Sequence, residues 1–226
     1  MFLVDTSYMH SPFTICANLV KRGMFDPFMM LNVLEIRTLL SDCPRVLDVG
    51  CGLASPLQYL GLEGSVGIDG YEPAIATARK AATHSEFVIG DIRQLPTVFQ
   101  KKQFDACIAL DVIEHLPKED GFQLIRSMES VAKKRIIFLT PNGFLPQRHQ
   151  ERDDLQEHLS GWEATEMQQL GFSVIGMLGP KSLRGEFHVL KRQPRAFWAL
   201  YSLFKQLTFT RRHPQSAAAI LCYKDL

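Results

Sequence analysis

The chain has 226 residues, of which 46% are hydrophobic and 22% charged, and its formal net charge is +1. This length fits one α/β domain with a sizeable core and room for an insertion. The balanced charge gives no electrostatic argument for a nucleic-acid partner, and no apolar run is long enough to span a bilayer. The first residues, MFLVDT, lack the basic start and apolar core of a signal peptide, so we expect a cytoplasmic protein.

The five cysteines are scattered along the chain, and no Cys-x-x-Cys pair occurs. An odd, scattered set is typical of reduced intracellular thiols. We therefore expect structural thiols and no metal centre.

Residues 1–25 are mixed in composition and indicate a weakly structured arm, which either packs on the domain surface or forms a lid over a ligand. The domain is predicted to run from residue 26 to residue 226. Asp26 and Pro27 are typical of a helix start, and apolar residues follow at helical spacing: Phe28, Leu31, Leu34 and Leu39.

The segment from Arg45 to Pro56 predicts a strand, a glycine turn at Gly50 and Gly52, and the start of a helix capped by Ser55. Glycines let the backbone pass close to a ligand, and a helix N-terminus offers unpaired N–H groups. The pattern therefore predicts a nucleotide cradle. A dinucleotide fold would place a third glycine where Ser55 stands, so that fingerprint is incomplete.

Downstream, strands and helices alternate, which favours a mostly parallel sheet covered on both faces. Further strands are predicted at 65–69, 86–91, 104–111, 135–140, 172–178 and 217–223, and residues 179–216 form an insertion. A capping box at Ser160 and Glu163 predicts a helix that Gly171 ends. Ligands bind beyond the carboxyl ends of such strands, where the sequence places Asp69, Asp91, Asp111 and Asn142.

The order of these pieces resembles the class I S-adenosylmethionine (SAM) methyltransferases, in their ubiquinone-biosynthesis-like, small-molecule branch. The resemblance covers about Asp26 to Leu178 and the last strand. It rests on Asp48-Val-Gly-Cys-Gly52, Gly67-Ile-Asp69, Gly90-Asp-Ile92, Phe104-Asp-Ala and Asp111-Val-Ile-Glu-His115. Ala54 stands where the motif's usual last glycine would be. The resemblance implies a Rossmann-like seven-stranded sheet, mostly parallel with the last strand antiparallel, and SAM as the cofactor.

Cofactor-binding roles follow from the same resemblance. Asp69 would hold the ribose hydroxyls and Asp91 would meet the adenine amino group, although Asp91 could also be only a strand-end cap. Tyr71 could stack on the adenine or pack on the surface. The full implied set is Asp48, Gly50, Cys51, Gly52, Asp69, Gly70, Tyr71, Asp91, Ile92 and Asp111.

The candidate bases for removing a proton from an acceptor are His115, His158 and Glu114. A histidine titrates near neutral pH, which suits a base. The alternative interpretation is that His115 is a structural histidine that opens the next helix.

Within the insertion, residues 196–209 are rich in aromatic and apolar side chains, and basic residues lie on both sides of this segment, within 191–195 and 211–213. This pattern is typical of peripheral membrane contact, but it also fits a cap over a greasy acceptor or a helix packed on the domain or on a second subunit. We expect a small-molecule or lipid-linked acceptor and no nucleic acid, since no Asn/Asp-Pro-Pro-Tyr/Phe pattern follows the fourth strand. The alternatives are a non-catalytic SAM-binding protein, a protein methyltransferase and a nicotinamide oxidoreductase. Ser55 and Asp91 disfavour the last. The sequence leaves the oligomeric state open.

Overall fold

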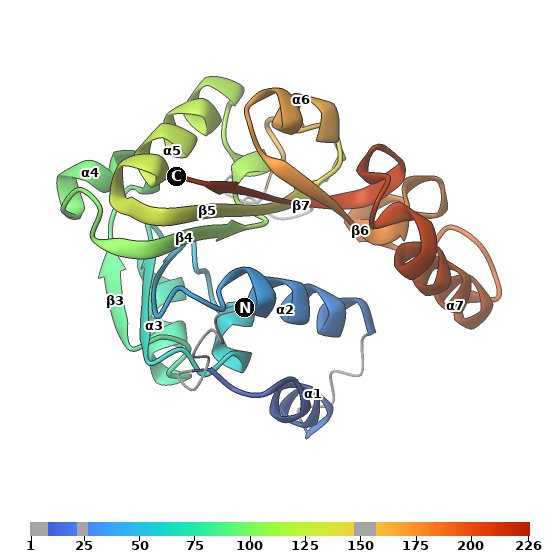
Figure 1. Cartoon of the computed structure of the whole chain (residues 1–226), viewed down its shortest axis with the longest axis horizontal. Coiled ribbons are helices and arrows are strands. Elements are labelled where there is room, and N and C mark those ends of the chain that lie inside the picture. The colour runs from blue at the N-terminus through green and yellow to red at the C-terminus, as the bar shows by residue number, and fades with distance from the viewer. Residues whose placement is uncertain (1–8, 22–26, 147–156) are drawn as a thin grey trace, which may run out of the picture. The chain divides into compact units, whose positions relative to one another are not determined.

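The computed structural model describes residues 9–21, 27–146 and 157–226. The chain falls into two compact units: the first unit holds residues 1–109, 126–136 and 226, and the second unit holds residues 110–125 and 137–225. In the described ranges, the strands form a seven-stranded sheet in the order β3-β2-β1-β4-β5-β7-β6. Strands β1 to β4 pair in parallel, and β7 runs antiparallel to β6 (Figure 1). The predicted fold class is therefore confirmed.

The strands lie close to where the sequence predicts them. Each strand begins and ends within a few residues of its predicted bounds, because turn residues delimit the runs of apolar residues. The strands are β1 (Arg45–Val49), β2 (Gly64–Asp69), β3 (Glu86–Ile89), β4 (Phe104–Leu110), β5 (Ala132–Pro141), β6 (Ser173–Pro180) and β7 (Ala217–Asp225).

Helices fill the connections. They are α1 (Pro12–Lys21), α2 (Pro27–Leu39), α3 (Glu72–Lys80), α4 (Leu95–Val98), α5 (Lys118–Val131), α6 (Ala164–Gln169) and α7 (Arg195–Lys205). The predicted start of α2 at Pro27 is confirmed, whereas its predicted cap, Asp26, lies outside the described residues. None of the helices described here is both long enough and apolar enough to cross a membrane.

The N-terminal arm contains a helix, which the mixed composition did not predict. Ser11 begins α1 by accepting a hydrogen bond from the Thr14 N–H at 3.1 Å, and Ile15 and Leu19 are fully buried. The His10 N–H donates to the Leu60 carbonyl at 2.7 Å. Burial and backbone pairing thus hold this part of the arm on the first unit.

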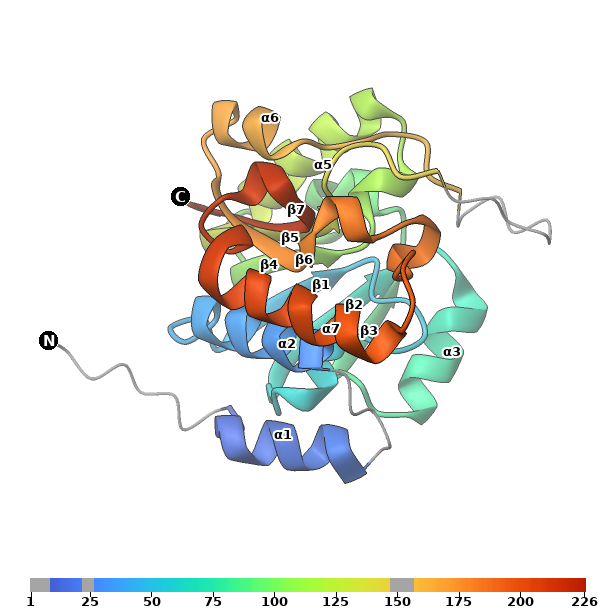
Figure 2. The same ribbon diagram turned by 90° about the vertical axis from the view of Figure 1, so that its right-hand side faces the viewer.

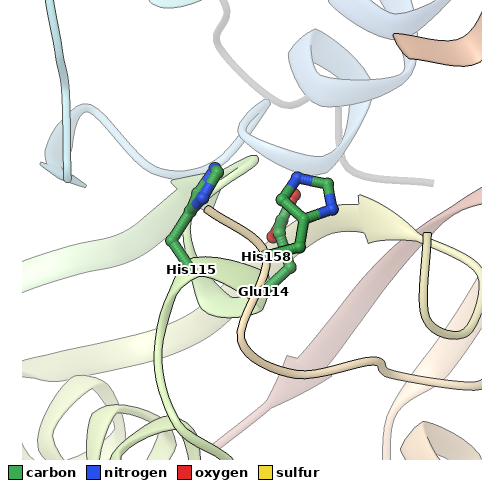
Figure 3. Close-up of side chains that lie close together, drawn as sticks. All are labelled: Glu114, His115 and His158. Atoms are coloured by element: carbon green, nitrogen blue, oxygen red, sulfur yellow. The ribbon is translucent and has the colours of Figure 1, made fainter. Parts of the chain in front are cut away.

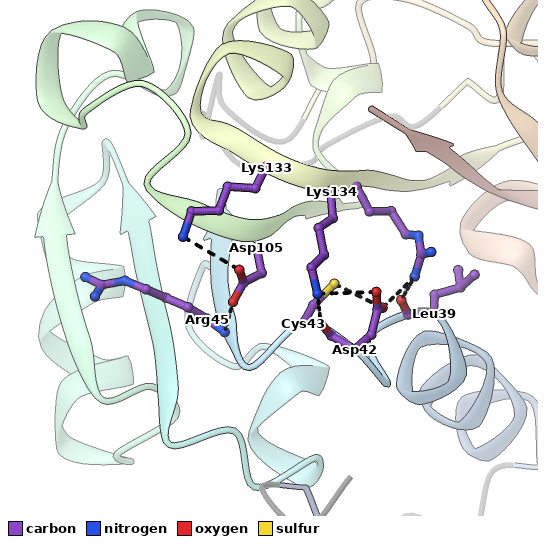
Figure 4. Close-up of polar contacts among 8 residues, drawn as sticks. Leu39, Asp42, Cys43, Arg45, Asp105, Lys133 and Lys134 are labelled. Carbon is purple, nitrogen blue, oxygen red and sulfur yellow. Dashed lines mark hydrogen bonds and ion pairs between the residues drawn. The ribbon is translucent and has the colours of Figure 1, made fainter. Parts of the chain in front are cut away.

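Ion pairs occupy the start of β1 and the basic run that opens β5 (Figure 4). Asp105 accepts a hydrogen bond from the Arg45 N–H at 3.0 Å and lies 3.8 Å from Lys133 Nζ. Asp42 lies 3.5 Å from Lys134 Nζ and 3.3 Å from an Arg135 guanidinium nitrogen. The three consecutive cations are therefore paired within the first unit and do not form a free basic patch of the kind that binds phosphates.

In the second unit, Asn142 replaces the predicted capping box. The structure begins α6 at Ala164, whose N–H donates to Asn142 Oδ1 at 3.2 Å. Ser160 does not cap this helix; its hydroxyl donates to the Ile113 carbonyl and accepts from the Trp162 indole N–H. The capping-box prediction was wrong because a buried amide from a distant loop supplies the acceptor. The end of this helix at Gly171, with φ of 88°, is confirmed.

Helix α7 continues into a π-helical turn, Gln206–Thr210, and Figure 2 shows this segment running beside β6. Its small or polar side chains are buried, whereas several of its large apolar ones are exposed. Ser202, Gln206 and Thr210 are 0%, 2% and 1% exposed. Glycines in β6 explain this orientation: a Cβ on Gly176 would lie 1.9 Å from the Thr210 carbonyl oxygen, and one on Gly179 would lie 2.1 Å from Ser202 Oγ. The backbone of the helical segment therefore approaches β6 too closely for large side chains on that face.

Candidate functional site

The glycine turn after β1 has the backbone that the sequence predicts. Gly50 and Gly52 have φ values of 72° and 55°, in the left-handed region that favours glycine. The N–H groups of Gly50 and Cys51 donate to the Ile68 carbonyl at 2.8 and 3.2 Å. No heavy atom lies within 4 Å of the position that a Cβ on Gly52 would take, so the space beside it is open. This is a cradle into which a ligand can approach the backbone.

The helix predicted after this turn is a single 3-10 turn, Pro56–Tyr59. Ser55 caps it as expected, accepting from the Leu57 N–H at 3.2 Å. A turn this short has a negligible helix dipole. The open backbone of the glycine turn, and not a helix N-terminus, is thus the feature that suits a ligand here.

Asp69 at the end of β2 is held by the glycine turn. Its Oδ2 accepts from the Gly52 N–H at 2.9 Å and its Oδ1 accepts from the Tyr71 N–H at 2.8 Å. Each carboxylate oxygen keeps a further lone pair. The carboxylate is therefore fixed in orientation and can still accept hydrogen bonds from the hydroxyl groups of a ligand.

Asp48 lies beneath the turn and not on its open side. Its carboxylate is almost fully buried, with Oδ2 3.1 Å from His84 Nε2, and the His84 side chain is fully buried as well. A Cβ on Gly67 would lie 2.7 Å from His84 and 2.8 Å from Cys51 Sγ. Burial, with the charges of Asp48 and Asp69, raises the pKa of Cys51, so this thiol is not a reactive thiolate.

Asp91 follows β3 as an N-cap of the next 3-10 turn. It accepts from the Arg93 N–H at 2.9 Å, and the Arg93 guanidinium binds both of its oxygens at 2.8 to 3.2 Å. These hydrogen bonds lower the pKa of Asp91. The sequence did not reveal this partner, and the capping interpretation that it left open describes the observed contacts. Tyr71 and its neighbour Gly70 lie beside Asp69, and the Tyr71 ring is 46% exposed.

The second unit begins at the end of β4, and a 3-10 turn at Ile113–His115 follows that carries the acidic residue Glu114. The Glu114 side chain is 2% exposed and accepts from the Thr140 hydroxyl at 3.0 Å. Burial, and then the charge of Asp111, raise the pKa of Glu114 to about 8. Asp111 itself has a left-handed φ of 52° just after the strand.

The two candidate bases, His115 and His158, lie together although 42 residues separate them in the sequence (Figure 3). Their ring centroids are 4.8 Å apart at 70°. His115 Nδ1 lies 3.1 Å from the Glu157 carbonyl oxygen and His158 Nδ1 lies 2.7 Å from the Leu145 carbonyl oxygen. The hydrogen bonds that the Glu114 carbonyl accepts from the N–H groups of Leu159 and Ser160 bring His158 to this turn.

A pocket of about 770 Å³ lies beside α7. Aromatic rings and cations line it together, among them Trp198, Tyr201, Lys181, Arg192 and Lys205. The Arg192 guanidinium lies over the Trp198 ring at 4.7 Å. Because cations and aromatic faces share this wall, the pocket suits an apolar ligand that carries negative charge.

Comparisons with known proteins match the part of the chain that holds the glycine turn and Asp69. Residues 47–140 match the model of a methyltransferase domain. The chain is 28% identical to a ubiquinone biosynthesis O-methyltransferase of Actinobacillus pleuropneumoniae serotype 7 (strain AP76), over 49% of this chain and 53% of that protein. It is 35% identical to an 18S rRNA (guanine-N(7))-methyltransferase of Bos taurus, over 38% of this chain and 31% of that protein.

A solved structure of a SAM-dependent methyltransferase from Archaeoglobus fulgidus is similar over 92% of this chain and 99% of that chain. Its TM-score is 0.53 and its sequence identity is 16%, so the similarity concerns the fold. The chain spans about half the length of the ubiquinone biosynthesis relative.

Proposed function

Because the chain belongs to the class I SAM-dependent methyltransferases, we propose that it transfers a methyl group from SAM to a small-molecule or lipid-linked acceptor. The observation that carries the proposal is the hydrogen bond from the Gly52 N–H to the Asp69 carboxylate, because both residues lie in the part of the chain that matches the methyltransferase domain. When bound, SAM supplies a methyl group on a sulfonium that a nucleophile can displace in line.

The residues of the first unit fit this cofactor. The open space beside Gly52 accommodates a ligand close to the backbone, and Asp69 can accept hydrogen bonds from two ribose hydroxyls. Tyr71 offers an exposed ring for stacking, and Gly50, Cys51 and Gly70 contribute backbone next to these groups. Asp91 and Ile92 are proposed for the adenine, with Arg93 holding the Asp91 carboxylate. Asp48 would act through its negative charge beneath the turn. Asp111 belongs to the second unit, and its role at the methionine end or the substrate stays a prediction from the sequence.

Replacing Asp69 by alanine should weaken binding of S-adenosylhomocysteine by about 1–3 kcal/mol, because a charge-assisted hydrogen-bonding group is lost. Titration calorimetry measures this, with NAD as a control ligand. Asp105→Ala is the matched control, since Asp105 also accepts a backbone N–H but lies at the opposite ends of the strands. Equal affinity in wild type and Asp69→Ala would refute the assignment, and binding of NAD alone would overturn the proposed function.

For the acceptor, we propose that His115 and His158 act on the reacting group. A carbonyl oxygen can only accept, so each histidine must carry its proton on Nδ1, which leaves a lone pair on each Nε2. A neutral imidazole can take a proton from a hydroxyl acceptor through its other ring nitrogen. Alignment of the acceptor with the methyl group would supply much of the remaining rate enhancement.

The pocket beside α7 supports a lipid-linked acceptor, and the outer face of α7 supports contact with a membrane. Phe197, Leu200, Phe204 and Leu207 are 57% to 68% exposed on that face. From Phe187 to Lys224 the sequence contains no acidic residue, whereas residues 191–213 contain six lysines and arginines. Exposed apolar side chains among cations complement an anionic lipid surface. We therefore propose a cytoplasmic protein that binds peripherally to membrane through residues 191–213.

The double substitution Leu200→Ser and Phe204→Ser should reduce co-sedimentation with liposomes containing anionic lipid by about tenfold or more, because each side chain would lose apolar burial of about 1.5 kcal/mol or more. Added salt should weaken wild-type binding too. Val98→Ser, which changes an exposed apolar residue in the first unit, serves as the control. A wild-type protein that does not sediment with these liposomes would end the membrane proposal and leave the cofactor assignment intact.

A further inference from the structure

The two histidines and Glu114 meet the first requirement of a metal site, which is that donor atoms converge. One potential ligand atom from each of Glu114, His115 and His158 lies within 4.8 Å of the other two, and Figure 3 shows the three side chains gathered at the turn after β4. Donor atoms on one tetrahedral ion lie roughly 3.3 Å apart. Side-chain rotation of about 1.5 Å or less would therefore bring the three to one ion.

The hydrogen bonds of the two imidazoles are a second and independent observation. A histidine that binds a metal through one ring nitrogen almost always donates its other N–H to a carbonyl or carboxylate, which fixes the tautomer and the ring orientation. Both histidines do so here, through Nδ1 to the carbonyls of Glu157 and Leu145. The same kind of hydrogen bond thus orients two imidazoles that come from two separate segments.

The carboxylate has matching support. The Thr140 hydroxyl donates to Glu114 Oε2 at 3.0 Å, which fixes the orientation of the carboxylate. Glu114 and His158 are both buried, at 2% and 8% exposed. A buried acid beside two imidazoles is costly to keep unless a cation or a proton neutralises it. A cation at this place would therefore stabilise the ionised carboxylate.

We propose that Glu114, His115 and His158 bind a divalent transition-metal cation through one carboxylate oxygen and two imidazole nitrogens. The chemistry of the donors favours zinc, iron, cobalt or nickel over magnesium and calcium, which prefer oxygen ligands. Three protein ligands leave at least one coordination position for an oxygen of a bound molecule. This departs from the expectation, based on the scattered cysteines, that the protein has no metal centre.

A cation held here would deepen the proposed transfer by binding an acceptor hydroxyl and lowering its pKa. The two imidazoles would then hold the cation and would not themselves take the proton. The O–H proton would pass to solvent, the acceptor oxygen would form the bond to the methyl carbon, and the carbon–sulfur bond would break with its electron pair going to sulfur. This role rests on the proposed function. Metal binding itself does not, because it can be measured without cofactor or acceptor.

The test is a titration of the full chain, without a histidine tag and freed of metal by chelator, with Co²⁺. Bound Co²⁺ in a low-symmetry site of nitrogen and oxygen donors shows visible absorption that the hydrated ion lacks, and Zn²⁺ should displace it. We expect His158→Ala and Glu114→Gln each to weaken binding by more than about tenfold, and Thr140→Val to weaken it by roughly tenfold by freeing the carboxylate. His213→Ala removes an exposed histidine of the same unit and should bind as wild type.

Circular dichroism checks that each variant is folded. Glu114→Gln and Thr140→Val are nearly isosteric, so they keep the test decisive if His158→Ala does not fold. Absence of the Co²⁺ absorption in wild type, or equal affinity in wild type and the folded ligand variants, would overturn the metal site. Titration with S-adenosylhomocysteine on the same preparation reports separately on the proposed function.

Discussion

Replacing His84 by leucine is expected to lower the free energy of unfolding by about 3–5 kcal/mol. The reason is Asp48, whose carboxylate is buried with Oδ2 3.1 Å from His84 Nε2. Replacing the imidazole by an apolar side chain takes a polar neighbour away from a buried carboxylate, and this strongly destabilises the fold. Leucine is close to histidine in size, so lost packing contributes little. In a domain of this length, thermal denaturation should show a midpoint lower by roughly 6–20 °C.

The double variant Asp48→Asn, His84→Leu separates the contribution of the Asp48 carboxylate to the lost stability from other contributions. Asparagine has the shape of aspartate without its charge, so the double variant should recover about half or more of the lost stability. A double variant as unstable as His84→Leu would show that packing around the ring, including its edge contact with Phe87, is the cause. A melting midpoint of His84→Leu within about 2 °C of wild type would contradict this argument.

The sequence could predict the elements because each one is encoded locally. The glycine turn at Gly50 and Gly52 needs left-handed φ values that favour glycine. The pair Ser55 and Pro56 is typical of a cap and a first helical residue, and it indicates where the next turn begins. The order of strands follows from apolar runs between turn residues. These signals lie within a few residues of one another, so a single sequence is enough to read them.

Pairings between distant segments could not be predicted in this way. His84 meets Asp48, and His158 meets His115, because the fold joins segments that the sequence separates. A histidine gives no local sign of which partner it will face. Helix α7 is a related case, because the sequence left open whether it packs on the domain, and the close approach of Ser202 to Gly179 in β6 explains why its small polar face is buried. Tertiary contacts of this kind override local patterns.

Asn142 is the clearest example of a residue whose place was predicted and whose role was not. Its position at the end of β5 suggested that it lines a ligand site. In the structure its side chain is 5% exposed, and Nδ2 donates toward the carbonyls of Pro214, Gln215 and Ala217 at 2.8 to 3.1 Å. Its Oδ1 accepts from the Ala164 N–H at the start of α6. One amide thus joins the ends of three segments of the second unit.

Asn142→Asp should therefore destabilise the protein by about 3 kcal/mol or more, and by more than Asn142→Ala. The two side chains have the same shape, but aspartate replaces the NH2 donor with an oxygen that faces three carbonyl oxygens. Each buried acceptor left without a donor lowers the stability of the protein by about 1–3 kcal/mol. Alanine only removes the partners and leaves space that water can enter. Chemical denaturation of the three proteins gives the order directly. If Asn142→Asp were as stable as wild type and changed only ligand binding, Asn142 would line a site, as its position in the sequence suggested.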